Sequence, residues 1–156
     1  MDTDRIEQLD PATCWALLRT TTVGRLAVAT DRGADIFPVN YVVDDGTVVF
    51  RTAAGSKLVA ALGTETVAVE ADGVDGARQG ASAMVWSVVL RGRATEIGGL
   101  QATLDTFELP LFPWHDSPKN CFVRITPGDV TGRRFRAAEP AHWTHFLSGA
   151  PHSSPE

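Results

Sequence analysis

Cysteine is scarce in this chain. Its 156 residues contain only Cys14 and Cys121, which lie far apart and form no paired motif. That count excludes a disulfide framework, and we expect two buried, reduced thiols that behave as small core residues. No metal site is predicted, and a reducing cytoplasm is the expected location.

Long hydrophobic runs and net positive charge are also missing. No apolar run approaches the ~20 residues of a membrane span, and the acidic start MDTDRIEQLD shows no signal peptide. The formal net charge is −5 with a pI near 5.3. A general nucleic-acid or acidic-membrane binder needs a basic surface, so we expect neither partner.

What the chain does contain is ordinary for a soluble globular protein, with 44% hydrophobic and 21% charged residues. Its length suits one domain with a substantial core. We expect that domain to cover residues 1–136. Residues 137–156, rich in Pro, Ser and His, are expected to form a partly disordered C-terminal tail.

Short strands joined by turns dominate the pattern. Regular alternation of strands with long helices is absent, which argues against a doubly wound parallel sheet. We therefore expect a mainly β fold with small helices, a six- to seven-stranded antiparallel barrel that is closed or partly closed. The expected strands are residues 23–30, 36–43, 47–52, 66–71, 81–96, 121–125 and 130–135.

Two or three small helices are expected. The first begins with Asp10 as N-cap and Pro11 in its first turn, and buries Cys14, Leu17 and Leu18. Shorter helices are expected at 56–62 and 98–107. A polar leader before residue 10, a Gly-rich loop at 72–80 and an aromatic loop at 109–119 complete the pattern.

Proline interrupts the expected strand 36–43 at Pro38. Because proline has no N–H for a ladder, Pro38 indicates a strand edge, a bulge or a place where the strand opens. The irregularity lies next to Asn40 and Tyr41, which carry polar groups in an otherwise apolar run.

The strongest binding signal follows a hairpin turn at residues 44–46, Asp-Asp-Gly. The next strand ends in a cation and a hydroxyl, and a short helix then opens with Gly-Ser-Lys. Helix N-terminal amides favour anions, and the side chains add donors. We expect a phosphate seat here, although a simple helix cap with a solvated lysine is the alternative. Its residues are Arg51, Thr52, Ser56 and Lys57.

Several short motifs lie in a fixed order over about three-quarters of the chain. They are Val23-Gly24-Arg25-Leu26-Ala27, Pro38-Val39-Asn40-Tyr41, Val49-Phe50-Arg51-Thr52-Ala53, Gly55-Ser56-Lys57-Leu58, Trp86-Ser87-Val88, Arg91-Gly92-Arg93-Ala94 and Ile125-Thr126-Pro127. The ordered set resembles the pyridoxamine 5'-phosphate oxidase-like family of flavin-binding split barrels. More narrowly, it is similar to the small bacterial branch that includes nitroimidazole-resistance reductases.

The resemblance implies a six-stranded split barrel that forms a homodimer, with two flavin sites at the subunit interface. It places the flavin phosphate on the seat described above. It also assigns residues that line the flavin ring, namely Pro38, Val39 and Asn40. Residues that complete the cleft wall in the same chain would be Ala53 and Leu58.

The partner subunit would contribute further contacts. The resemblance implies that Trp86 and Ser87 approach the cofactor from the partner, and that the loop around Trp114 closes over the ring. From its position on a strand alone, Trp86 is more often a core residue than part of a cofactor wall.

The implied function is an oxidoreductase that reduces a small conjugated or nitroaromatic acceptor through FMN, with no dedicated catalytic side chain. Two alternatives keep the fold. One is a deazaflavin-dependent reductase, although the helix after Lys57 lacks the extra basic residues that the longer anionic tail of this coenzyme would need. A haem cofactor on the same fold would need an axial histidine, and the histidines of this chain lie in expected loops or the tail. The other is a non-enzymatic flavin-binding or storage dimer.

Overall fold

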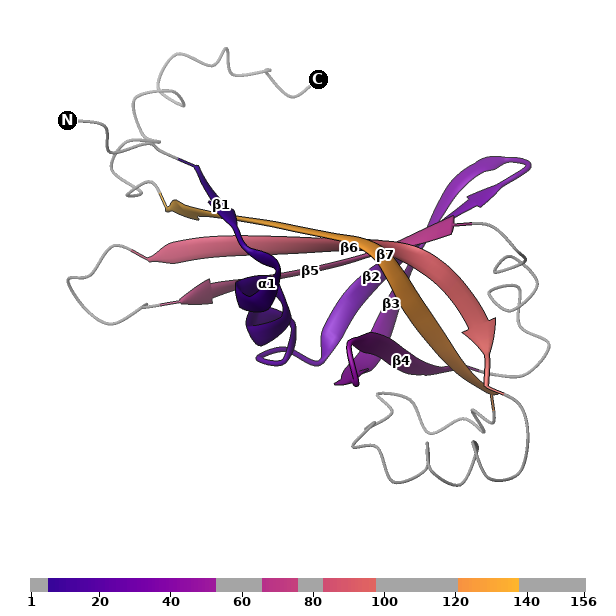
Figure 1. Ribbon diagram of the computed structural model, residues 1–156. Helices are drawn as coiled ribbons and strands as arrows, with labels where there is room; N and C mark the ends of the chain where they lie inside the picture. The colour runs from indigo at the N-terminus through magenta and orange to yellow at the C-terminus, as the bar shows by residue number, and fades with distance from the viewer. Residues whose placement is uncertain (1–5, 53–65, 76–82, 98–120, 138–156) are drawn as a thin grey trace, which may run out of the picture.

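The computed structural model describes residues 6–52, 66–75, 83–97 and 121–137. Within these ranges the chain forms seven strands and one helix (Figure 1), so the mainly β class is confirmed. In chain order they are β1 (Glu7–Leu9), α1 (Pro11–Leu18), β2 (Val23–Thr30), β3 (Gly33–Asp44), β4 (Thr47–Thr52), β5 (Thr66–Asp75), β6 (Met84–Glu96) and β7 (Cys121–Arg136).

The sheet closes on itself. Its antiparallel strands follow the order β1-β7-β4-β3-β2-β5-β6, and β6 pairs again with β7. Six strands therefore form a closed barrel, and β1 is added on the free edge of β7 beyond β4. This is the predicted antiparallel split barrel of six to seven strands.

Alternate residues of each strand fill the barrel, as the period of a strand requires. Among the side chains that are no more than 2% exposed are Leu26 of β2, Tyr41 of β3, Phe50 of β4, Leu90 of β6 and Ile125 of β7. All belong to one hydrophobic core.

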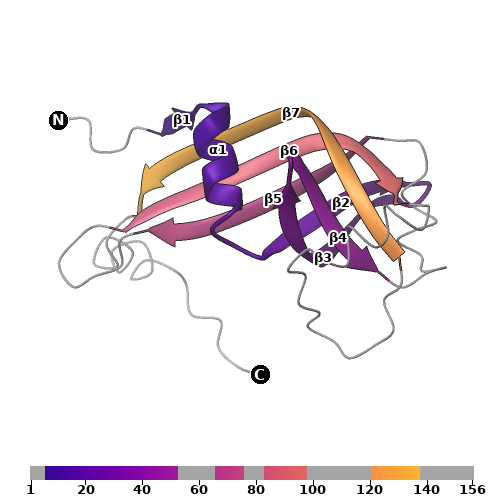
Figure 2. The same cartoon turned by 60° about the horizontal axis from the view of Figure 1, so that its bottom comes forward.

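Beyond the barrel, β5, β6 and β7 continue as a ribbon, and α1 lies across one face of it (Figure 2). The helix begins as predicted, because the Asp10 carboxylate accepts a hydrogen bond from the Thr13 N–H at 2.9 Å. Its buried face carries Cys14, Leu17 and Leu18. The ribbon accommodates it at Gly132, where a Cβ atom would lie 2.6 Å from the Cys14 sulfur.

A β-bulge separates barrel from ribbon. The β6–β7 register shifts at Arg91 and Gly92, which face Asp129 and Pro127, so Gly128 is the extra residue. The prediction of two separate strands at 121–125 and 130–135 is therefore wrong. The Pro127-Gly128 pair, which the sequence analysis interpreted as a turn between two strands, lies at a bulge within the single long strand β7.

Further boundaries differ from the prediction, and the largest differences are at β5 and β1. β5 extends to Asp75, where a loop from residue 72 was expected, because its end pairs with β6 down to Met84. The predicted leader contains β1, since residues 7–9 pair with β7. In both places partners distant in sequence override weak local propensity.

Pro38 lies on a strand edge, as one of the three interpretations predicted. β3 pairs with β2 without a register shift from Gly33 to Asn40, whereas its pairing with β4 begins only at Tyr41. Within the described ranges, the side of β3 without a partner strand therefore includes Pro38, whose missing N–H costs no ladder bond there.

The predicted helices at 56–62 and 98–107, the loop at 109–119 and most of the tail fall outside the described residues. In the part that is described, no helix is long and apolar enough to cross a membrane. The same ranges hold no group of three or more His, Cys, Asp or Glu side chains arranged for a metal ion.

Candidate flavin site

The candidate site begins with a row of side chains on the outside of β3, β4 and β7. Arg51 is the direct cross-strand partner of Phe122. Asn40 lies on the outer face of β3, one residue before Tyr41, where the pairing of β3 with β4 begins, and Arg51 is one residue beyond the Phe50 that faces Tyr41. The outer row therefore consists of Asn40, Arg51 and Phe122.

Arg51 lies over the ring of Phe122, with its guanidinium carbon 5.2 Å from the ring centroid. That distance is typical of a cation–π contact, which orients the planar guanidinium. Arg51 remains half-buried. A partly desolvated, oriented cation binds an anion more strongly than a fully solvated one does.

Apolar side chains surround this cation on the outer face. Val49 and Phe122 are 0% and 2% exposed, yet neither belongs to the hydrophobic core inside the barrel. Both side chains are therefore already shielded from water, next to the half-buried Arg51. Surroundings with few polar groups suit a flat conjugated ligand.

Next to this row, at the end of the outer face where the β3–β4 hairpin turns, lies a cluster of polar side chains. Arg124 forms an ion pair with Asp44 at 2.9 Å and donates a hydrogen bond to the Thr47 hydroxyl at 2.6 Å. Arg124 is therefore engaged with the β3–β4 hairpin. It stiffens the strands that carry Arg51.

Two predicted site residues point into the barrel instead. Thr52 and Val39 are 8% and 7% exposed and follow the inward alternation of their strands. Arg51 and Thr52 therefore face opposite sides of β4, and Thr52 lies opposite Cys121. A ligand outside the barrel at the end of β4 can therefore contact the Arg51 side chain and the main chain, but not the Thr52 side chain.

Cys121 is buried, as predicted for both thiols. Burial, together with a hydrogen bond to Glu96, raises its pKa to about 11. The thiol is therefore protonated and unreactive near neutral pH.

Trp86 and Ser87 lie on the ribbon, remote from Arg51. Ser87 is aligned with Arg133 of β7, and Arg51 with Phe122. Residues 122 and 133 are 11 positions apart, which corresponds to roughly 35 Å along an extended strand. One chain does not bring Ser87 and Arg51 together.

Trp86 is only 2% exposed and belongs to the core. Its indole packs over Gly73, where an added Cβ would lie 2.6 Å from the ring. The core interpretation of Trp86 therefore matches its surroundings in this chain, while Ser87 lies on the outer face between Asp72 and Arg133.

Pro38 and Asn40 lie on the outer face, and Pro38 is aligned with Arg25 of β2. The Arg25 guanidinium contacts Asp72 at 2.9 Å and Glu70 at 3.0 Å, and these carboxylates raise the pKa of Arg25. This network was not predicted, since β5 lies 45 residues further along the chain.

Phe122 is the site residue that sequence reasoning missed. The run from Cys121 to Val123 is apolar on both faces, so its pattern does not distinguish an outward ring from an inward one. The remaining predicted residues lie outside the described ranges, and their roles stay predictions. They are Ala53, Ser56, Lys57, Leu58 and Trp114.

The barrel and its outer row of side chains are consistent with one family of known proteins. The sequence profile of pyridoxamine 5'-phosphate oxidase matches residues 10–134. The chain therefore belongs to the pyridoxamine 5'-phosphate oxidase family, and the resemblance found in the sequence is confirmed.

Several relatives come from species of Mycobacterium and Corynebacterium. The FAD binding protein from Mycobacterium smegmatis shares 36% identity and a TM-score of 0.70, over 83% of this chain and 98% of that one. A Corynebacterium glutamicum structure shares 32% identity and a TM-score of 0.72, over 86% and 96%. An uncharacterised Mycobacterium tuberculosis protein is 32% identical over 85% of this chain and 87% of its own length.

Proposed function

We propose that this chain is a flavin-binding oxidoreductase that works as a homodimer. The row Asn40–Arg51–Phe122 carries the proposal, because it sets an oriented cation on a buried apolar surface. A flavin nucleotide needs both features: a cation for its phosphate and a flat apolar wall for its ring.

Relatives support a flavin and help to choose its form. FMN is the form predicted from the sequence. The name of the 36% identical Mycobacterium smegmatis protein supports FAD instead. Both nucleotides carry a phosphate next to the ribityl chain, so Arg51 serves either one.

A bound flavin supplies hydride or electron transfer, and the protein contributes binding and orientation. Arg51 would hold a phosphate oxygen through its planar fork, kept in place by the Phe122 ring. The Asn40 amide both donates and accepts, so it fits the polar edge of the ring system. Val49 and Phe122 would keep water from that surface.

The separation of Ser87 from Arg51 supports the proposed dimer. Ser87 and Arg51 are about 35 Å apart along β7, so they share one site only if Ser87 comes from a second copy. The outer face also offers an apolar contact surface. Ile36 is 67% exposed and lies next to Ala27, which is aligned with Ala68.

Cofactor identity is tested first. The purified protein is examined by visible absorption, and any released chromophore is separated by chromatography against FMN, FAD and the deazaflavin coenzyme. FAD or FMN at one per chain supports the proposal. A protein that retains only deazaflavin supports the deazaflavin reductase, and one that ignores all three contradicts the site.

Two variants test the site itself. Arg51→Gln should weaken flavin binding by tenfold or more, from the loss of charge-assisted hydrogen bonds. Arg32→Gln removes the same charge at the exposed β2–β3 turn and should leave binding unchanged. Equal losses in both variants would mean that only net charge matters.

Activity is measured on the flavin-loaded protein. Reduction by NADH or NADPH followed by reoxidation with a nitroaromatic or a quinone supports an oxidoreductase that acts on small conjugated acceptors. A loaded protein that no donor reduces supports flavin storage instead.

The dimer is tested by sedimentation. Ile36→Glu should shift the protein toward monomer and lower flavin retention with it. Ile6→Glu changes another exposed isoleucine, next to β1, and should do neither. A wild-type monomer that binds flavin fully would overturn the shared site.

A further inference from the structure

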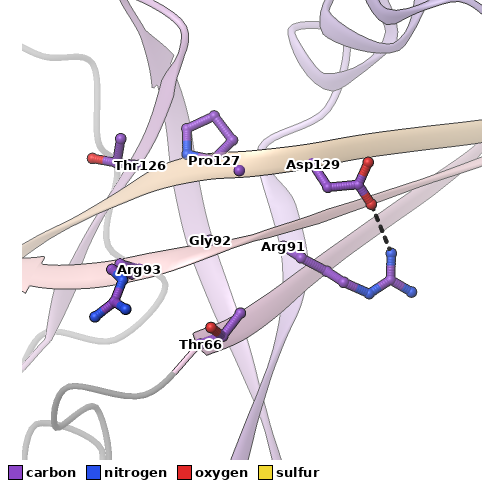
Figure 3. Close-up of a pocket in the computed structure, with 8 residues that line it drawn as sticks. Thr66, Arg91, Gly92, Arg93, Thr126, Pro127 and Asp129 are labelled. Carbon is purple, nitrogen blue, oxygen red and sulfur yellow. Dashed lines mark hydrogen bonds and ion pairs between the residues drawn. The ribbon is translucent and has the colours of Figure 1, made fainter.

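A cavity lies on the outer face at the β-bulge (Figure 3), where β5, β6 and β7 run side by side. Its volume is about 430 Å³, and its walls include Thr66, Gly92, Pro127 and Gly128. At Gly92 the main chain of β7 comes so close that a Cβ atom would overlap the Thr126 carbonyl oxygen. Glycine and proline contribute no polar side-chain atoms, so this part of the cavity suits an apolar group.

An exposed ion pair stands at the edge of this bulge cavity. The Asp129 carboxylate is 3.3 Å from one nitrogen of Arg91, and both side chains are more than half exposed. An exposed, single-contact pair contributes little stability, so its side chains can move aside at little cost. The aliphatic stem of Arg91 can then pack on an apolar group while the guanidinium stays in water.

One row of side chains on the outer face joins the bulge cavity to a projecting apolar residue. Ile36 of β3 is aligned with Ala27 of β2, Ala27 with Ala68 of β5, and Ala68 with Arg91 of β6. Ile36 is 67% exposed, the most of any large apolar side chain in the described ranges. The row therefore has a projecting side chain at one end, the cavity at the other and two small residues between them.

The neighbouring row is self-complementary in charge. Two residues away along each strand, Arg25 of β2 is aligned with Glu70 of β5, and the two side chains form an ion pair at 3.0 Å. Arg25 also contacts Asp72 at 2.9 Å, so one guanidinium serves two carboxylates. A second guanidinium placed over Glu70 would therefore meet an excess of negative charge.

A two-fold axis between β2 and β5, parallel to the strands, uses both rows at once. In the sheet order β3-β2-β5-β6, rotation about this axis lays β2 of one copy over β5 of the other, and β3 over β6. Arg25 of each copy then faces Glu70 of the other. The small side chains Ala27 and Ala68 meet at the axis and allow close approach.

We propose that Ile36 of each chain inserts into the bulge cavity of a second copy of this chain. The rotation sets Ile36 over Arg91 of the second copy, at the edge of its cavity. Because the outside of a barrel is convex, the gap between the copies widens away from the axis, and a projecting side chain is needed to bridge it. The inference rests on the dimer of the proposed function and names the surface through which that dimer forms.

The same rotation agrees with the proposed flavin site. Asn40 is aligned with Val23, and Ser87 with Asp72; both pairs lie two residues beyond the row of Arg25. With β3 over β6, Asn40 therefore lies over Ser87 of the second copy. The position of the axis was fixed by other residues, so this meeting supports it independently.

Cross-linking tests the contact directly. Chains with Ile36→Cys and chains with Arg91→Cys are co-expressed and treated with a short bismaleimide, and both native thiols are buried. Cross-linked dimers should form. Each variant alone should give none, because the two equivalent positions lie on opposite sides of the axis. Ile6→Cys co-expressed with Arg91→Cys is the control and should give none.

Shortening the side chain tests the fit. Ile36→Ala should raise the Kd of the dimer at least tenfold in sedimentation, because apolar area is no longer buried in the cavity. Ile6→Ala shortens another exposed isoleucine, next to β1, and should leave the Kd unchanged. An unchanged Kd for Ile36→Ala would overturn the inference.

The outcomes separate this inference from the proposed function. A wild-type dimer that binds flavin, with no cross-link between positions 36 and 91, contradicts the Ile36 contact but not the flavin site. A dimer that cross-links and binds no flavin supports the contact and contradicts the flavin site. A wild-type monomer contradicts both.

Discussion

The Gly92 Cα and the Thr126 carbonyl oxygen lie so close together that no side chain fits between β6 and β7 at this point. The contact involves main chain on both sides, so neither strand can yield without losing ladder hydrogen bonds. Only glycine is compatible with the crossing. The bulge, and the cavity next to it, depend on that one residue.

Gly92→Ala should therefore lower the free energy of unfolding by about 3 kcal/mol, the upper part of the overpacking range. Urea denaturation measures it. Gly128→Ala is the matched control, because its Cβ would meet its nearest neighbour, the Arg91 carbonyl oxygen, at an ordinary 4.0 Å. A control as damaging as Gly92→Ala would assign the effect to the loss of glycine flexibility.

Tyr41 ties the barrel to α1. Its buried hydroxyl donates a 2.8 Å hydrogen bond to the carbonyl oxygen of Leu18, the last residue of the helix. Helix C-terminal carbonyls lack partners in the helix itself. Tyr41→Phe should cost about 1–3 kcal/mol, because it leaves a buried acceptor unsatisfied.

The control for Tyr41 is Thr30→Val, which removes two solvent-exposed hydrogen bonds, one that the Thr30 hydroxyl donates to the Gly33 carbonyl oxygen and one that it accepts from the Arg32 N–H. Its effect should stay within about 0.5 kcal/mol. Similar losses in the two variants would show that burial of the Leu18 carbonyl is unimportant.

Alkaline pH should destabilise the protein through Cys121, whose pKa is raised to about 11 by burial. An unfolded thiol ionises near pH 8.5. Between those values the unfolded chain loses a proton that the folded chain keeps, so the free energy of unfolding falls as pH rises. Burial also raises the pKa of Cys14 and Tyr41, which act in the same direction.

Stability measured from pH 8 to pH 10 checks this linkage. Cys121→Ala should reduce the slope against pH, and adding Cys14→Ala should reduce it further. In the wild type both thiols should react slowly with a thiol reagent at pH 8 until urea exposes them. Rapid labelling of the native protein would contradict their burial.

Gly73 fixes the position of Trp86. Because an added methyl would lie 2.6 Å from the indole, Gly73→Ala should displace the ring and cost about 1–3 kcal/mol. ¹⁹F NMR of fluorotryptophan-labelled protein, assigned with Trp86→Phe, reports the ring directly. Asp72→Ala alters the neighbouring outward residue, and an identical shift there would argue against direct contact.

Local sequence signals predicted what depends on local structure. Asp10 and Pro11 marked the start of α1, and β2 and β4 have the predicted bounds. Pro127 and Gly128 led to the wrong prediction of a turn between two strands, because the bulge needs the same residue types as a turn. The ends of β1 and β5 depend on partners far along the chain, which periodicity does not reveal.

The sequence predicted the chemical character of the site better than the directions of its side chains. Arg51, Pro38 and Asn40 were chosen from their motifs, and they share the outer face of the barrel. Strand alternation sends Thr52 and Val39 inward, a consequence of register that the motifs do not encode. Phe122 and the bulge cavity emerge only once β7 is placed between β4 and β6.

β7 is the last strand along the described chain and has neighbours on both edges: β6 along one, then β4 and β1 along the other. During synthesis, β4 and β6 leave the ribosome with open edges, and α1 lacks β7, the strand on which it mainly packs. These edges are prone to aggregation until β7 arrives. A chain truncated before β7 should therefore be a chaperone client rather than a smaller stable domain.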